Sequence, residues 1–103
     1  MYKLEILPIA KRDMDNIIYY VANCLNNKRA ANKLSKAFIK GIDNILIFPC
    51  GSSEYKPISK LCNHYRCTKV KNFIIFYIVN TENNLIIITR VAYEKMNFIH
   101  LLK

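Results

Sequence analysis

Six basic or aromatic residues in the last third of the chain are the strongest candidates for chemistry. A cation can stabilise the charge that develops on phosphorus during RNA cleavage, while a base takes the proton of the 2′-hydroxyl. The base is the weak part of this set, because tyrosine is a poor proton acceptor at neutral pH unless cationic neighbours stabilise its phenolate. The residues therefore predict phosphate binding, and RNA cleavage only in principle. They are Arg66, Lys69, Lys71, Arg90, Tyr93 and Lys95.

The sequence does not contain the residue patterns of phosphate-binding loops, paired catalytic carboxylates or catalytic triads. The chain has only two glycines, too few for a glycine-rich phosphate loop, and its carboxylates are scattered rather than paired. His64 and His100 lie outside any recognised triad context, and no serine sits in a nucleophile motif. These gaps exclude most familiar hydrolases and transferases.

The cysteines do not have metal-ligand or redox spacing. No two of them form a Cys-x-x-Cys pair, and two histidines add little to a zinc site. We therefore expect reduced thiols, no bound metal and no cofactor. The four cysteines are Cys24, Cys50, Cys62 and Cys67.

The charge of the chain predicts an anionic partner. Sixteen Lys and Arg against seven Asp and Glu give a net charge of +9. Residues 56–71 carry five basic groups and no acidic one, whereas residues 1–55 carry eight basic and five acidic groups. The partner could be nucleic acid, a nucleoprotein machine or an acidic protein. A merely solvated lysine-rich surface is the alternative.

The elements that must position the six candidates are three strands. Residues 73–79 are seven consecutive apolar residues, rich in β-branched and aromatic types, which predicts a central strand buried on both faces. Lys71-Asn72 before the run and residues 80–84 after it have turn compositions. Residues 65–70 and 85–92 are then the antiparallel neighbours of the central strand.

The first half of the chain predicts a short strand and a helical hairpin. Residues 2–7 alternate in polarity until Pro8, which has no amide proton for a ladder. Apolar residues then recur at the helical period through residues 14–25 and 31–46, with a break at Asn26-Asn27. Asp13 and Asp15 are placed near the first turn, where the helix dipole favours acids. Residues 49–63 are assigned to loop.

Size and hydropathy set the class of protein. A chain of 103 residues is expected to fold as one domain over residues 1–103. No apolar stretch approaches the roughly 20 residues that span a bilayer, and the N-terminus lacks a signal-peptide core, so we expect a soluble, cytosolic protein. The predicted fold class is α+β, with an N-terminal strand, an antiparallel two-helix hairpin packed on one face of a small, mainly antiparallel sheet, and a short C-terminal tail or helix.

The order of these pieces resembles the RelE/ParE superfamily of bacterial type II toxins. The likeness covers essentially the whole chain and is carried by four segments. Residues 4–14 resemble the opening strand and first helix, and residues 26–31 the inter-helix turn with its paired alanines, without the usual proline. Tyr65-Arg66 with residues 70–77 is similar to the hairpin, and residues 90–98 to the closing strand.

Departures from the ribonuclease pattern indicate which branch the chain resembles. In the superfamily that the chain resembles, ribonuclease members typically carry an arginine after the central-strand aromatic, and a histidine is common near the end of the last strand. This chain has Ile74 and Tyr93 at those positions. Lys95 and Met96 replace later arginines. The resemblance therefore implies the ParE-like branch, with inhibition of DNA gyrase and neutralisation by a cognate antitoxin protein.

Two alternatives stay open. One is ribosome-dependent cleavage of mRNA through Arg66, Arg90, Tyr93 and Lys95, and the other is a non-toxic basic module that binds nucleic acid. For gyrase or nucleic acid, the expected binding residues are Lys69, Lys71, Arg90 and Lys95.

Overall fold

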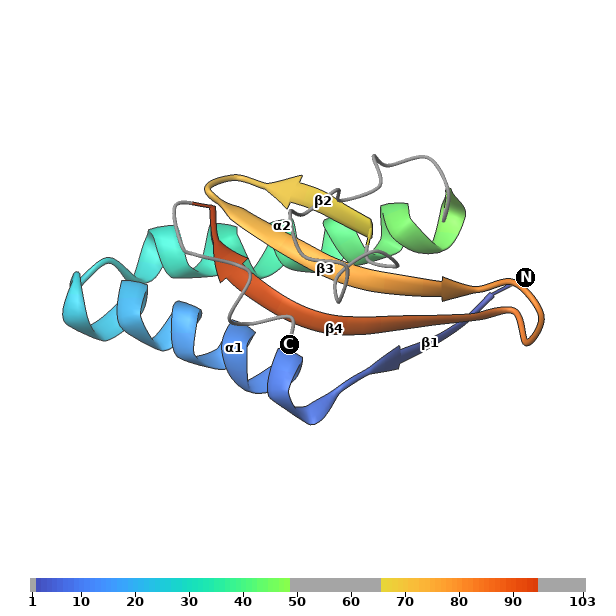
Figure 1. Ribbon diagram of the computed structural model, residues 1–103. Coiled ribbons are helices and arrows are strands. Elements are labelled where there is room, and N and C mark those ends of the chain that lie inside the picture. Colours follow the sequence, from blue (N-terminus) through green and yellow to red (C-terminus); the bar gives the residue numbers. More distant parts are fainter. Residues whose placement is uncertain (1, 49–65, 95–103) are drawn as a thin grey trace.

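The computed structural model describes residues 2–48 and 66–94, and it arranges two helices over a four-stranded sheet (Figure 1). Tyr65, Lys95, both histidines and the predicted loop at 49–63 lie outside the described residues, as do the residues of the predicted C-terminal tail after Glu94. The elements, in chain order, are β1 (Lys3–Ile6), α1 (Pro8–Tyr19), the π-helix η1 (Tyr20–Cys24), α2 (Lys28–Ile47), β2 (Arg66–Val70), β3 (Phe73–Asn80) and β4 (Leu85–Tyr93).

The sheet confirms the predicted central strand. Its order is β1-β4-β3-β2; β3 is antiparallel to both neighbours, and only β1 runs parallel to its partner β4. Ile75 and Tyr77 belong to the core under the helices, whereas Phe76 points to the other face and is equally inaccessible to solvent. Burial on both faces explains why this strand reads as a continuous apolar run.

Asparagine and lysine close the turns. Val70 pairs with Phe73, so the β2–β3 connection is the two-residue turn Lys71-Asn72, with Lys71 at a φ of 54°. In the β3–β4 turn Asn84 has a φ of 51°, and the Asn80 side chain accepts a hydrogen bond of 3.2 Å from the amide of Asn83. Left-handed backbone suits asparagine better than lysine, so strain is concentrated at Lys71.

Pro8 separates β1 from α1 as predicted and is itself the first residue of α1. The helix therefore starts earlier than the placement of Asp13 and Asp15 near its first turn requires. Proline at the first helical position places Asp13 at the sixth residue of α1, and the first turn contains no acidic residue. The dipole explanation for Asp13 and Asp15 is therefore wrong. The apolar stripe at Met14, Ile17, Ile18 and Val21 does pack on the core, but Leu25 is exposed beyond η1.

The break at Asn26-Asn27 has a capping role. Asn26 adopts a left-handed φ of 50°, and the Asn27 side chain accepts a hydrogen bond of 3.0 Å from the amide of Ala30, which satisfies one free donor at the start of α2. From there α2 buries a stripe against the sheet. Its buried residues are Ala31, Leu34, Phe38, Ile42 and Ile45.

No helix in the described part of the chain is long and apolar enough to cross a membrane.

Candidate functional site

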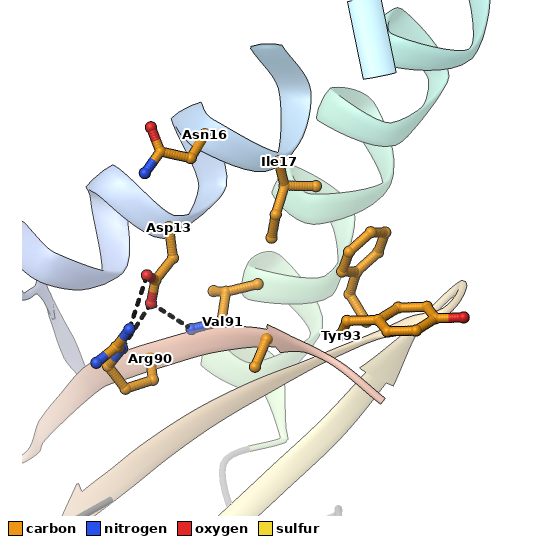
Figure 2. Close-up of a pocket in the computed structure, with 8 residues that line it drawn as sticks. Asp13, Asn16, Ile17, Arg90, Val91 and Tyr93 are labelled. Atoms are coloured by element: carbon orange, nitrogen blue, oxygen red, sulfur yellow. Dashed lines mark hydrogen bonds and ion pairs between the residues drawn. The ribbon is translucent and has the colours of Figure 1, made fainter. Parts of the chain in front are cut away.

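A cavity of about 200 Å³ lies between α1 and the end of β4 (Figure 2). It contains two of the six predicted site residues, Arg90 and Tyr93. Asp13, Asn16 and Ile17 line it from α1, and Phe73 lines it from β3. The remaining lining residues are Val91 and Ala92 of β4.

Asp13 binds Arg90 through both carboxylate oxygens. Arg90 Nε donates to Oδ2 at 2.7 Å and Nη2 donates to Oδ1 at 3.0 Å, while the backbone amide of Val91 donates to Oδ2 at 3.1 Å. Both side chains are largely withdrawn from solvent, with 20% of Arg90 and 14% of Asp13 exposed. A two-point guanidinium–carboxylate contact is directional and strong, so it fixes the orientation of Arg90.

The local backbone of β4 explains this geometry. Phe76 pairs with Arg90 but the next residue, Tyr77, pairs with Ile88, so Thr89 is an extra residue in β4 and forms a bulge. The Thr89 hydroxyl donates to the carbonyl of Phe76 at 3.1 Å. The bulge changes the alternation of the strand, and Ile88 and Val91 both join the core beneath the helices.

The short β1 leaves an edge that Asp13 occupies. β1 pairs with β4 only from Leu85 to Ile88, and the ladder ends with the Leu7 amide donating to the Ile88 carbonyl at 3.0 Å. Beyond that point β4 has no strand partner on this edge among the described residues, and the Val91 amide donates its hydrogen bond to the Asp13 carboxylate. Asp13 therefore satisfies a backbone donor and a cation together, and it joins α1 to β4.

Tyr93 ends a row of aromatic rings. Its ring packs edge-on against Phe73 with a centroid distance of 5.8 Å, and Phe73 packs in the same manner on Phe38 of α2, also at 5.8 Å. Tyr93 is 42% exposed. These edge-on contacts hold the Tyr93 ring in place at the rim of the cavity.

Three of the other predicted residues lie elsewhere on the sheet, and the fourth, Lys95, is outside the described residues. Lys69 forms an ion pair with Glu94, with Nζ 3.0 Å from Oε2, and Lys71 occupies the adjoining turn. Arg66 is at the opposite end of β2, level with Tyr77. The structure thus gathers Arg90 and Tyr93 into one cavity, Lys69 and Lys71 at one end of β2, and Arg66 at its other end.

The two charged side chains of the cavity, Asp13 and Arg90, form an ion pair with each other. The carboxylate and guanidinium neutralise each other, and the phenol is the remaining ionisable group among the described lining residues. A phosphate approaching Arg90 would compete with Asp13 for the guanidinium. This arrangement suits positioning and binding better than proton transfer.

Thiols and metal ligands add nothing to this site within the described ranges. Cys24 and Cys67 are free thiols, and no group of three or more His, Cys, Asp or Glu side chains is placed there to hold a metal. Burial raises the pKa of the Cys67 thiol. Cys50 and Cys62 fall in the undescribed segment.

A second charged feature, a row of cations on α2, was not predicted from the sequence. Four cations of α2, spaced four, three and four residues apart, share one helix face and are all exposed. The five acids of residues 1–55 offset these cations in a count of charges along the chain, but the helical spacing of the cations would have revealed the face. We call it the α2 basic face; it consists of Arg29, Lys33, Lys36 and Lys40.

Solved structures that share this fold include a bacterial toxin and bacterial toxin–antitoxin systems. The chromosomal ParDE TA system from P. aeruginosa aligns with a TM-score of 0.69 and 17% identity, over 90% of this chain and 96% of that chain. The isolated RelE toxin of E. coli aligns with a TM-score of 0.60 and 12% identity, over 98% of this chain and 93% of that chain. The RelBE2 toxin–antitoxin complex of Mycobacterium tuberculosis aligns with a TM-score of 0.56 and 14% identity, over 89% of this chain and 96% of that chain.

Fold and sequence together define a toxin of the RelE/ParE superfamily, as the sequence predicted. The family model for the ParE toxin of the type II toxin–antitoxin system parDE matches residues 4–98. The chain therefore belongs to the ParE toxin family of type II toxin–antitoxin systems. No curated protein is similar enough in sequence to count as a match.

Proposed function

We propose that this chain inhibits DNA gyrase in the cytoplasm and that a cognate antitoxin neutralises it. The observation that carries the proposal is the match of residues 4–98 to the ParE toxin family. Two of the structures with the same fold, ParDE and RelBE2, are described as toxin–antitoxin assemblies, which supports a protein partner here.

The site supports a binding role over RNA cleavage. A ribonuclease needs a proton acceptor and unopposed positive charge at the scissile phosphate, which together supply several powers of ten in rate. In this cavity Asp13 neutralises the charge of Arg90, and the ring of Tyr93 packs edge-on against Phe73. Ile74, in the central strand, adds no charge.

The two mechanisms can be separated by running two assays on one preparation. We expect purified protein to inhibit supercoiling by gyrase and to leave mRNA on translating ribosomes intact. Arg66→Ala and Tyr93→Phe are the informative variants, because a ribonuclease should lose cleavage with either. Codon-positioned cleavage that these variants abolish, with supercoiling untouched, would replace the gyrase proposal with the ribonuclease.

The partner is tested with the neighbouring gene. A small protein encoded beside this chain should co-purify with it at low ionic strength, and the complex should weaken as salt screens the +9 charge. If the co-expressed neighbour never co-purifies at low salt, the proposed pairing is wrong.

A further inference from the structure

The four cations of the α2 basic face outnumber the one acid of that helix, Asp43, which is exposed and follows Lys40 by three residues. Arg29, Lys33, Lys36 and Lys40 lie opposite the buried stripe of α2, and none of the four forms an ion pair with another described residue. The face extends about 16 Å along the helix at 1.5 Å per residue. Like charges three or four residues apart destabilise a helix, so the fold alone gives no reason for the arrangement.

A cavity of about 220 Å³ adjoins this face. Its apolar walls are Val21, Leu34 and Phe73, and Lys33 and Lys71 also line it. Lys33 thus belongs both to the cavity and to the α2 basic face. Ala30 and Asn72 complete the lining, in which no described residue is acidic.

We propose that the α2 basic face and this cavity bind an acidic peptide segment of a protein partner. Carboxylates of the segment would lie along Arg29, Lys33, Lys36 and Lys40, and one apolar side chain would enter the cavity beside Phe73. The inference rests on the proposed antitoxin only for the identity of the partner.

The mixed character of the surface favours a peptide over a nucleic acid. A phosphate backbone would match the cations but offers nothing apolar to the walls formed by Val21 and Leu34. Bases stack on exposed aromatic faces, yet the described aromatic of the lining, Phe73, already packs against Phe38 and Tyr93. An acidic segment with an aliphatic anchor meets both requirements.

Synthetic peptides test the surface directly in the full chain. The probe has glutamates at successive helical turns and one leucine near its end, and its binding is followed by fluorescence anisotropy at low salt. We expect the glutamine version to bind roughly tenfold more weakly, because it loses the charge attraction. Replacing the leucine by alanine should weaken binding several-fold, because less apolar surface is buried.

Lys36→Glu is the decisive variant. It should weaken peptide binding roughly tenfold while leaving the thermal midpoint unchanged or higher, because the new acid is well placed to pair with Lys40. Lys3→Glu, an exposed residue of β1, makes the same change of charge away from this face and should have much less effect.

Two results would overturn the inference. One is an equal loss of binding in Lys36→Glu and Lys3→Glu, which would indicate attraction by net charge alone. The other is a DNA duplex of matched length that competes as well as the acidic peptide. Neither assay contains gyrase or an antitoxin, so failure here leaves the proposed function to its own tests.

Discussion

Gly41 of α2 lies so close to Val70 of β2 that a Cβ on the glycine would sit 2.6 Å from Val70 Cγ2. The same Cβ would be 3.5 Å from Ile75 Cδ1, an ordinary contact. Helix and strand approach closely at this point because the glycine has no side chain. A β-branched valine has little freedom to move away.

Gly41→Ala should therefore destabilise the protein. Overpacking costs about 1–3 kcal/mol, and it outweighs the gain of somewhat under 1 kcal/mol that alanine brings to a helix interior. Urea unfolding would measure the net loss. Combining Gly41→Ala with Val70→Ala should cost less than the sum of the two single changes; strictly additive losses would show that the two residues do not interfere.

Removing the Asp13 carboxylate should destabilise the fold by about 2 kcal/mol. Asp13→Ala leaves a half-buried guanidinium and the Val91 amide without their acceptor. Asp15→Ala on the same helix is the matched control, since Asp15 is exposed, and it should change stability by less than about 0.5 kcal/mol. Equal denaturation midpoints for the two variants would contradict a role for Asp13 in joining α1 to β4.

Substitution of Lys71 should be able to raise the stability of the protein. Its left-handed backbone suits asparagine or glycine, so Lys71→Asn should raise the free energy of unfolding by some tenths of a kcal/mol, and Lys71→Val should lower it by about 1 kcal/mol. Chemical denaturation of the pair decides the matter. If valine proves as stable as lysine, the strain assigned to this turn is absent.

The Cys67 thiol should lose its proton at higher pH than an exposed thiol. Its pKa is raised by burial, so iodoacetamide pulses followed by peptide mapping should label Cys67 more slowly than Cys24 and at higher pH. The protonated thiol favours the fold below the unfolded pKa of about 8.5, and this contribution is lost as pH rises through the folded pKa. Identical labelling profiles for Cys67 in the folded and urea-unfolded chain would refute the shift.

Local signals predicted most of the fold. The apolar run at 73–79 predicted the central strand, and asparagines and lysine predicted the turns. Pro8 predicted the end of the first strand, and Asn26-Asn27 predicted the break between the two helices. Each of these depends on residues a few positions apart, which is why the sequence alone was sufficient.

Contacts between distant segments were not predictable in this way. Asp13 and Arg90 are separated by 77 positions, and the acid was attributed to a helix dipole because its partner was unknown. The Thr89 bulge and the close approach at Gly41 arise from the register of β3 and β4 and from the packing of α2. The predicted roles of Arg66, Lys69, Lys71, Arg90, Tyr93 and Lys95 stay predictions.

Supercoiling of relaxed plasmid by purified gyrase is the most direct test of the proposed function. Increasing amounts of the folded chain should reduce supercoiling, and adding the co-purified antitoxin should restore it in proportion to the complex formed. Gyrase activity that is unchanged at every concentration of correctly folded protein would contradict the account.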